Sequence, residues 1–556
     1  MRSRIDSRVV FLFFCFLFAF LLLEGRVAYL QIYKGEELAV QAVERRMVTL
    51  KMGNFYRGDI LDREGRSLLD SQVVYRLAVF PSLIRDLPQT VERLSALLPQ
   101  ESRQIEETLT DEVKSKNPFI FQFTLDQEEA AELERENIPG IYAAPLRDRY
   151  GPQALARHIV GSVTGSVLQG SVEKGLNGIE SFYNKELTPR ESLVELGVVV
   201  NGRGEALKGG ELLARGKKGA VAGGNDVVLT LDRDVQQAVE NILDEHTEKG
   251  AAVLIDIPSG EIRALASRPS YSYNQGFLQG EEFDRCFGLY HPGSVFKIAV
   301  AAAALAEGVV DADEKFNCNG KYVFQSGEEI SCWKSEGHGE LTFSEAFAHS
   351  CNSVFVETAM RLGSLTLEHY AQLLGLEKGI AGYSKEKGGV VQIGGLPGEV
   401  GNAALGQDGV TVSPVNLAAL AAAIARGGIY RSPALVKSIC GPHGEVVKEI
   451  ESPPAQRVLP QHVAEEVQKM MELAVADGTG KKAQTPGLGS AGKTGSAETG
   501  RVDEQGEAVV DAWFVGYAPL EKPQLAVAVF VEGGGSGGDA AALIFKEIIL
   551  ALQSAI

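Results

Sequence analysis

The sequence predicts an α+β fold that follows an N-terminal membrane-spanning helix. Three observations lead to this prediction: an unbroken apolar run near the N-terminus, strand-like segments on both sides of an Ala-rich helical middle, and a globular composition. Of the 556 residues, 45% are hydrophobic and 23% are charged, which is typical of folded chains and not of disordered ones. We expect strands from distant parts of the chain to meet in one sheet around a helical cluster.

The apolar run at residues 9–23 would form a helix of about 22 Å, which is shorter than a bilayer core. Extended over residues 9–32, it becomes long enough, with Glu24 and Arg26 near the outer interface. Three arginines precede the run, so the positive-inside rule places residues 1–8 in the cytoplasm and the remainder of the chain outside. A cleavable signal peptide is the alternative, but no small-x-small cleavage site follows, which favours an uncleaved single-pass anchor.

Periodicity places the later elements. Helical spacing predicts helices at residues 127–137, 235–246, 298–305 and 540–552. Short apolar runs predict strands at residues 227–231, 251–257, 261–267, 509–517 and 524–532. A Pro-Ser-Gly turn joins the second and third of these strands, so they are expected to form an antiparallel hairpin. The Gly-rich, basic stretch at residues 202–224 is predicted to be a flexible connection or an exposed hairpin.

Composition argues against several classes of function. Asp and Glu outnumber Lys and Arg by 73 to 54, and a net charge of −19 repels phosphate backbones, so we expect no nucleic-acid partner. Six cysteines are too few for a disulfide scaffold, and no CxxC pair or His/Cys cluster has zinc-ligand spacing. The eight histidines include no HExxH pair. We therefore expect no metal site.

Two Gly-rich patterns match known motifs by coincidence. Residues 487–494 fit the phosphate-loop pattern GxxxxGK[ST], but the sequence continues into a turn-rich segment and a strand instead of a helix. Residues 533–538 fit both GxGxxG and GxSxG, but neither an acidic ribose partner nor a histidine follows them. We therefore expect no nucleotide ligand, and a loop or bulge beside a cleft at residues 533–538.

A third set of patterns carries chemistry. Ser294 and Lys297 begin an Ala-rich helix on one face, and a lysine with a lowered pKa can activate a serine hydroxyl. Residues 350–352 (Ser-Cys-Asn) offer a hydroxyl that relays a proton and an amide that holds a carbonyl. Residues 493–496 (Lys-Thr-Gly-Ser), on a predicted edge strand, offer a cation and hydroxyls for a carboxylate. Together they form a strong joint signal for nucleophilic catalysis.

This constellation resembles the serine acyltransferases of the penicillin-binding and β-lactamase superfamily, in which S-x-x-K, S-x-N and K-T-G occur in this order. Segments that are similar to class B penicillin-binding proteins lie at residues 57–65 (RGDILDREG), 157–161 (RHIVG), 175–180 (GLNGIE), 337–339 (GHG) and 511–516 (DAWFVG). The resemblance extends from the anchor to the C-terminus. The sequence departs from it at residues 406–409 (GQDG, where the family has GQG), at Ser496 (where Thr is common) and at Cys351.

The resemblance implies a domain order. After a cytoplasmic tail (1–8) and an anchor (9–32), it implies an elongated mixed pedestal domain over residues 33–224. A transpeptidase domain, an antiparallel sheet with a helical subdomain, is then expected over residues 225–556. The acidic glycosyltransferase signature of class A members is not found in the sequence.

It also implies a reaction and a set of roles. Ser294 is expected to attack the D-Ala–D-Ala carbonyl of a peptidoglycan stem peptide, Lys297 to accept its proton, and Ser350 to protonate the departing D-Ala. The residues expected to bind substrate are Asn352, Lys493, Thr494, Gly495 and Ser496. Backbone N–H groups of Ser294 and Ser496 would form the oxyanion hole. The implied ligands and partners are stem peptides, β-lactams, a membrane glycan polymerase and other cell-wall assembly proteins, with no cofactor.

Other functions remain open at this point. A β-lactamase or penicillin sensor of the same superfamily matches poorly, because about 190 pedestal residues precede the catalytic part. A D,D-carboxypeptidase would release D-Ala without crosslinks. A non-catalytic assembly scaffold would have no reason to keep Ser294, Lys297 and Lys493 together.

The cysteines allow two interpretations. Cys332 and Cys351 are a candidate redox pair, because a bond between them would close a loop of about 20 residues and pull on the turn that presents Ser350. Oxidation would then switch off transfer and reduction would restore it. In the alternative, Cys351 is a buried small hydrophobe, and Cys318 and Cys332 form a structural bond or none.

Overall fold

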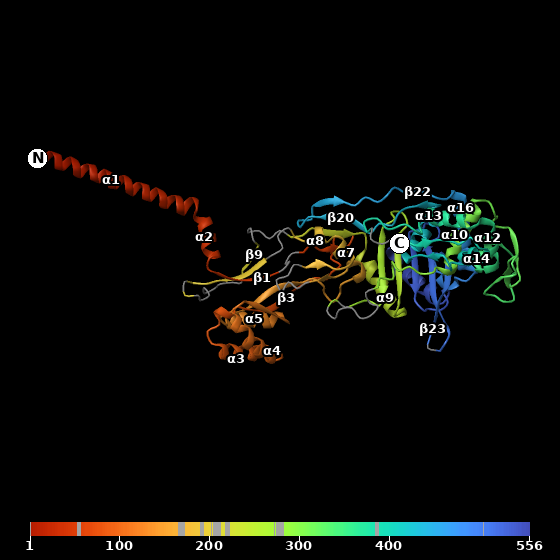
Figure 1. Cartoon of the computed structure of the whole chain (residues 1–556), viewed down its shortest axis with the longest axis horizontal. Helices are drawn as coiled ribbons and strands as arrows, with labels where there is room; N and C mark the ends of the chain where they lie inside the picture. Colours follow the sequence, from red (N-terminus) through yellow and green to blue (C-terminus); the bar gives the residue numbers. More distant parts are fainter. Residues whose placement is uncertain are drawn as a thin grey trace.

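The computed structural model describes residues 2–52, 57–164, 173–189, 194–201, 203, 213–216, 223–271, 273, 283–383, 388–503 and 505–555. The molecule is elongated, with helix α1 (Arg2–Ala28) projecting from one end and the C-terminal sheet and its helices forming the other end (Figure 1). A π-helical turn, η1 (Tyr29–Tyr33), and helix α2 (Gly35–Glu44) connect α1 to the body. The region between helix α2 and the C-terminal sheet holds two small sheets (Figure 1).

The N-terminal helix has the dimensions of a membrane span. Residues Ser7–Tyr33 form 27 helical residues, and an 18-residue window of this helix has a mean hydropathy of 2.2 with none of its residues buried. At about 1.5 Å per residue, such a helix is about 40 Å long, which exceeds the hydrocarbon core of a bilayer. By length and composition, it is the one helix in the described part of the chain that can cross a membrane. The predicted apolar helix is confirmed.

Two three-stranded sheets build the part that follows. The first has the order β1-β8-β9, and the second has the order β4-β3-β5. Their strands are β1 (Met47–Met52), β8 (Val194–Val199), β9 (Leu213–Gly216), β3 (Gln72–Val79), β4 (Phe119–Leu125) and β5 (Ile141–Asp148). Helices α3 (Leu87–Leu97), α4 (Ser102–Glu112) and α5 (Gln127–Glu136) pack on the second sheet through Leu94, Ile105 and Leu133.

Local sequence explains where α5 begins and ends. Asp126 and Glu129 form a capping box, in which each side chain accepts a hydrogen bond from the other residue's backbone N–H. Asn137 ends the helix in the left-handed conformation, with φ of 45°. The segment 202–224 contains strand β9, which pairs antiparallel with β8, as in a hairpin. Most of the other residues of this segment lie outside the described residues.

The pedestal and the C-terminal part share one hydrophobic core. Strand β2 (Ile60–Leu61) pairs in parallel with β10 (Asp226–Leu229), which pairs antiparallel with β20 (Val436–Cys440). Strand β21 (Val446–Glu449) completes this sheet. The short helices α6 (Arg157–Val160), α7 (Gly178–Phe182) and α8 (Asn184–Leu187) contribute Ile159, Ile179 and Leu187 to the same core cluster as the C-terminal helices.

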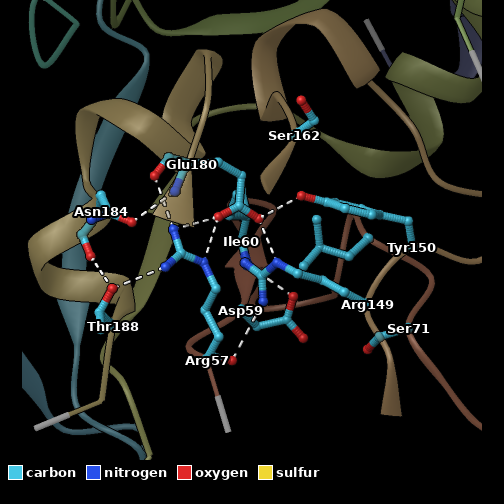
Figure 2. A network of polar contacts seen from close by, with 12 residues as sticks. Arg57, Asp59, Ile60, Ser71, Arg149, Tyr150, Ser162, Glu180, Asn184 and Thr188 are labelled. Carbon is cyan, nitrogen blue, oxygen red and sulfur yellow. Dashed lines mark hydrogen bonds and ion pairs between the residues drawn. The ribbon is translucent and has the colours of Figure 1, made fainter. Parts of the chain in front are cut away.

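A buried ionic network joins two of the segments that carry the family-like signatures, residues 57–65 and 175–180 (Figure 2). The carboxylate of Glu180 accepts a hydrogen bond from Arg57 Nε at 2.7 Å, one from Arg149, and one from Tyr150 OH at 3.1 Å. Arg57 also donates to Thr188 Oγ1 at 3.0 Å. Glu180 and Arg57 are only 0% and 2% exposed, so this network lies inside the protein and connects segments far apart in the sequence.

The C-terminal part is built on a five-stranded antiparallel sheet in the order β12-β11-β25-β24-β23. Its strands are β11 (Gly250–Asp256), β12 (Ile262–Arg268), β23 (Ala491–Val502), β24 (Ala508–Ala518) and β25 (Leu525–Val531). The predicted hairpin and the closure by distant segments are both confirmed, since Val253 pairs with Leu265 on one side and Ala528 on the other. Strand β23 is at the edge, as predicted.

Helices cover both faces of this sheet. One face packs on α9 (Arg233–His246) and α17 (Ala540–Ala551), and the other packs on α15 (Pro414–Ala425). All residues of β25 are buried, as expected for a strand covered on both sides. The helical cluster contains α10 (Lys297–Ala306), α11 (Phe343–Ala348), α12 (Asn352–Leu362), α13 (Ser364–Leu373), α14 (Pro397–Ala404) and α16 (Gln461–Ala476).

Small strand pairs complete the fold. Beside the helical cluster, β13 (Lys315–Cys318) pairs with β16 (Gly339–Thr342), and β14 (Lys321–Val323) pairs with β15 (Glu329–Ser331). The other short strands are β6 (Val163–Thr164), β7 (Lys174–Gly175), β17 (Val390–Val391), β18 (Val410–Thr411), β19 (Ile429–Tyr430) and β22 (Gln456–Arg457).

Candidate active site

The three chemical motifs meet at one cavity of about 590 Å³ at the edge of the five-stranded sheet. Ser294, Ser350, Asn352, Thr494 and Ser496 all line it. They come from the turn before α10, the turn before α12, and the edge strand β23. The structure thus brings together residues that are up to two hundred positions apart in the sequence.

We had expected Ser294 to lie in the first turn of an α-helix, but it lies in a 3₁₀ turn. This turn, η5 (Gly293–Phe296), leads directly into α10, whose first residue is Lys297. Gly293 has a φ of +54°, and its N–H donates to Gly406 O at 3.1 Å. A Cβ on Gly293 would lie 2.6 Å from Ser496 O, so this position requires glycine. The tighter turn places the half-buried Ser294 against strand β23.

Lys297 is fully buried and contacts the Ser-Cys-Asn motif. Its Nζ donates to Ser350 O at 2.9 Å, to Ser350 Oγ at 3.2 Å and to Asn352 Oδ1 at 2.9 Å. Burial lowers the pKa of Lys297 to about 8, and the nearby thiols of Cys351 and Cys332 oppose this effect. With this pKa, about a tenth of the lysine is neutral at pH 7, and the neutral form can act as a general base.

Ser350 has a backbone conformation that is uncommon for a residue with a side chain. Its φ is +56°, in the left-handed region. This turn allows Asn352 to begin helix α12 while its amide still reaches back, donating from Nδ2 to Ser331 O at 3.2 Å. Both side chains consequently face Lys297 and the cavity.

Lys493 is a second fully buried lysine, on the edge strand opposite Val515. Its Nζ donates to Thr494 O at 3.1 Å and lies 5.8 Å from the ring of Phe347. Burial, and secondly the charge of Lys297, lower its pKa well below the ordinary value. The next residue, Thr494, shares a hydrogen bond of 2.5 Å with Thr479 Oγ1. Because these residues lie in a strand, residues 487–494 do not have the geometry of a phosphate loop.

Gly495, which we expect to contact substrate, is also needed for packing. A Cβ there would lie 2.6 Å from Pro292 O and 2.9 Å from Val295 Cγ2. The glycine therefore lets the Ser294 turn pack directly against the strand. Ser496 Oγ accepts a hydrogen bond from Gly537 N at 3.2 Å. Residues 533–538 form a loop beside the cleft, as predicted.

Several residues that line the cavity were missed by sequence reasoning. Trp333, Asn402, Leu405, Thr479 and Glu498 belong to this group. No short pattern marks them, because each reaches the cavity through the packing of its own element. One further lining residue, Gln407, lies in the segment 406–409, where the sequence departs from the family pattern. In the same segment, Gly406 packs against Gly293.

The cysteines form a cluster that the sequence did not predict. The sulfur atoms of Cys332 and Cys351 lie 4.0 Å apart as free thiols, so the structure contains no bond between them. Cys318 and His338 join them, and the four ligand atoms lie within 4.8 Å of one another. We call these four residues the Cys3His cluster. The sequence spacing of these residues did not indicate the cluster, because loops bring them together.

Comparison with known families gives two matches that together span most of the chain. Residues 250–550 match the penicillin binding protein transpeptidase domain, and residues 54–221 match the penicillin-binding protein dimerisation domain. A crystal structure of the D,D-transpeptidase domain of a peptidoglycan glycosyltransferase from Eggerthella lenta has the same fold, with a TM-score of 0.61 at 24% identity. That similarity covers 90% of this chain and 99% of the other.

Relatives with assigned names are similar over nearly the whole length. Stage V sporulation protein D of Bacillus subtilis is 27% identical, covering 98% of this chain and 85% of that relative. Peptidoglycan D,D-transpeptidase FtsI of Escherichia coli is also 27% identical, covering 98% and 91%. Peptidoglycan D,D-transpeptidase MrdA of Acinetobacter baumannii is 26% identical, covering 98% and 86%. The chain belongs to the class B penicillin-binding proteins.

Proposed function

We propose that this protein is a peptidoglycan D,D-transpeptidase that crosslinks stem peptides through an acyl-enzyme on Ser294. One observation carries the proposal. Ser294, Ser350, Asn352, Thr494 and Ser496 line a single cavity, and behind it the buried Lys297 is hydrogen-bonded to Ser350 and Asn352. The names of the relatives described above support peptidoglycan as the substrate.

In the acylation step, Ser294 Oγ attacks the carbonyl between the two D-Ala residues. Neutral Lys297 accepts the hydroxyl proton, which a pKa of about 8 permits near neutral pH. Backbone N–H groups of Ser294 and Ser496 stabilise the developing oxyanion, each worth about 3–4 kcal/mol. The C–N bond then breaks, and Ser350, hydrogen-bonded to Lys297, passes a proton to the departing D-Ala amine.

In the second step, an amine from a neighbouring stem peptide attacks the ester. The amine loses its proton through Ser350 and Lys297, Ser294 Oγ recovers a proton, and the new amide is the crosslink. Asn352 holds the donor peptide by its amide, while Thr494 and Ser496 offer hydroxyls to the terminal carboxylate. A β-lactam presents the same carbonyl and carboxylate, so it acylates Ser294 and blocks the site.

The same proposal includes where the reaction takes place. The protein is a single-pass membrane protein, and the arginines before α1 favour a cytoplasmic N-terminus. Residues 33–224 then form a pedestal that carries the transpeptidase domain, residues 225–556, outside the membrane. A membrane glycan polymerase and other cell-wall assembly proteins are the partners expected for such an arrangement.

Intact-mass analysis with a labelled penicillin tests the proposal. We expect one adduct per chain, located on Ser294 by peptide mapping and lost in Ser294→Ala. With a donor pentapeptide and an acceptor amine, the crosslinked product should exceed the free tetrapeptide acid that hydrolysis of the acyl-enzyme would form. An adduct at another residue would exclude the mechanism. Hydrolysis alone would favour a D,D-carboxypeptidase, and rapid loss of the adduct would favour a β-lactamase.

A further inference from the structure

The Cys3His cluster lies directly behind the Ser-Cys-Asn motif and is assembled from four separate segments. Cys318 ends strand β13, Cys332 follows β15, His338 lies in the turn before β16, and Cys351 precedes helix α12. The three cysteines are buried, with exposures of 1%, 4% and 0%. Three thiols and an imidazole directed at one point inside a protein are the ligand set that Zn²⁺ prefers.

The distances fit a tetrahedral metal and do not fit a disulfide. With zinc–sulfur bonds of about 2.3 Å and a zinc–nitrogen bond of about 2.0–2.1 Å, tetrahedral ligands are separated by about 3.8 Å (S to S) and about 3.6 Å (S to N). In the structure, Cys332 Sγ lies 4.0 Å from Cys351 Sγ and 3.6 Å from His338 Nδ1. A disulfide would need the two sulfurs at about 2.05 Å.

The backbone around the cluster is held in place without a metal. Gly337 has a φ of +83°, and a Cβ on it would lie 2.2 Å from Cys318 O, so the turn that carries His338 packs tightly on β13. Cys332 N donates to Gly320 O at 2.8 Å, which ties the segment after β15 to the turn that follows β13. The ligands are thus oriented by main-chain contacts.

His338 directs one of its ring nitrogens at the cluster. Its Nδ1 is directed at the sulfur of Cys332, while its Nε2 is buried and has no hydrogen-bond partner among the described residues. Trp333 lies against the ring in an edge arrangement, with the centroids 5.4 Å apart. A bound metal gives Nδ1 the strong interaction that its orientation implies.

We propose that Cys318, Cys332, Cys351 and Nδ1 of His338 bind one Zn²⁺ ion as a structural site. Binding deprotonates the three thiols, so three protons are released, and the neutral imidazole donates a lone pair. All four positions are then occupied by protein, so the ion has no place for water or substrate and is structural. It links β13, β15, β16 and α12 at one point.

The consequence for the reaction rests on the proposed function. Cys351 stands between Ser350 and Asn352, so a metal–sulfur bond fixes the turn in which Ser350 has its left-handed conformation. The same ion holds Cys332, next to Trp333, which lines the cavity and donates from Nε1 to His349 O at 3.0 Å. Cys351 is therefore a positioning residue. Metal binding and a Cys332–Cys351 disulfide exclude each other, because both use the same sulfurs.

Metal content and cobalt spectroscopy of the full chain in detergent test the site without relying on activity. We expect one zinc per chain by elemental analysis. After reduction and removal of the metal, Co²⁺ should give a thiolate charge-transfer band and the intense visible bands of a tetrahedral site, saturating at one equivalent. Absence of both zinc and the cobalt spectrum in reduced, folded protein would overturn the proposal.

Matched variants identify the ligands. His338→Ala and Cys318→Ser should lose stoichiometric metal, whereas His338→Cys, which preserves a fourth soft ligand, should retain it with a stronger charge-transfer band. Cys440→Ser, outside the cluster, is the control and should keep one equivalent. If His338→Ala keeps the full cobalt spectrum, His338 is not a ligand and the proposed ligand set is wrong.

Penicillin acylation then measures the positioning effect. Metal-free, reduced wild-type protein should acylate Ser294 about 10-fold more slowly, and added Zn²⁺ should restore the rate. Equal rates with and without zinc would overturn the positioning role while leaving the metal site intact. Absence of acylation in both forms would instead contradict the proposed function, so the two failures are distinguishable.

Discussion

At the scale of single residues, two buried lysines divide the work of the site by their contacts. Lys297 Nζ reaches Ser350 and Asn352, whereas Lys493 Nζ donates only to the carbonyl of Thr494 among the described contacts. Burial lowers the pKa of both lysines, to about 8 for Lys297 and well below the ordinary value for Lys493. Position, and not the protonation state alone, therefore distinguishes the base from the supporting residue.

We predict that Lys297→Ala slows acylation by penicillin about 10²–10⁴-fold, the range for loss of a general base. Lys493→Ala should cost much less, because Lys493 has no contact with Ser350 or Asn352 among the described hydrogen bonds. Stopped-flow acylation with a chromogenic β-lactam gives both rates. Lys469→Ala, on the exposed side of α16, is the control. Equal losses at the two buried positions would show that the base is shared or wrongly assigned.

The acylation rate should also depend on pH with a definite sign. Only neutral Lys297 accepts a proton, and its pKa is lowered by burial to about 8. The rate should therefore increase about tenfold per pH unit well below pH 8 and level off above it. Single-turnover acylation across this range checks the prediction. A rate that falls as the pH rises through 8 would require a protonated lysine and contradict the mechanism.

At the scale of elements, the site depends on how closely the Ser294 turn packs on strand β23. Glycines on both sides allow this approach, since added Cβ atoms at Gly293 and Gly495 would lie 2.6 Å from Ser496 O and Pro292 O. Both of these contacts are with backbone atoms, which cannot move without moving the element. The distance between Ser294 and strand β23 is thus set by residues with no chemistry of their own.

Gly495→Ala should separate the strand from the turn, reduce acylation by more than about 10-fold and destabilise the protein by about 1–3 kcal/mol. Gly395→Ala is a matched control, because a Cβ there meets nothing within 4 Å. Acylation kinetics and thermal unfolding, measured on both variants, separate the two effects. Wild-type rates in Gly495→Ala would mean that the packing of the turn does not position the nucleophile.

At the scale of the whole molecule, a shared core connects the N-terminal part to the C-terminal part, and the Glu180 network joins distant segments within the N-terminal part. One buried carboxylate faces the guanidinium groups of Arg57 and Arg149 (Figure 2). Close charge pairing offsets the cost of burying these groups, so removing the carboxylate would leave two cations uncompensated. Glu180 is therefore the shared partner of these two buried cations.

We predict that Glu180→Gln destabilises the protein by about 3–5 kcal/mol. A thermal or denaturant scan of the full chain should show a lower midpoint for the transition of this region. Glu132→Gln, on the exposed side of α5, makes the same chemical change and should have little effect. An unchanged midpoint in Glu180→Gln would show that the network contributes nothing to the stability of this part of the protein.

Local patterns were sufficient for much of this description. The apolar run predicted α1, the Pro-Ser-Gly turn predicted the β11–β12 hairpin, and three short motifs predicted the residues that meet at the cavity. Each of these depends on neighbours within a few residues, where periodicity and turn chemistry act. The 3₁₀ turn at Ser294 was missed, because it depends on the contact between Gly293 and strand β23.

By itself, the sequence determined the anchor, the order of the strands and helices, and the Ser, Lys and Asn groups available for acyl transfer. Only the tertiary structure decided which of these groups face one another, why Gly495 is a glycine, and that Cys318 and His338 join Cys332 and Cys351. The physical reason is the range of the interactions. Helix periodicity and turns are set by adjacent residues, whereas a metal-ligand cluster or a buried ion pair is created by packing between segments whose spacing in the sequence carries no record of their contact.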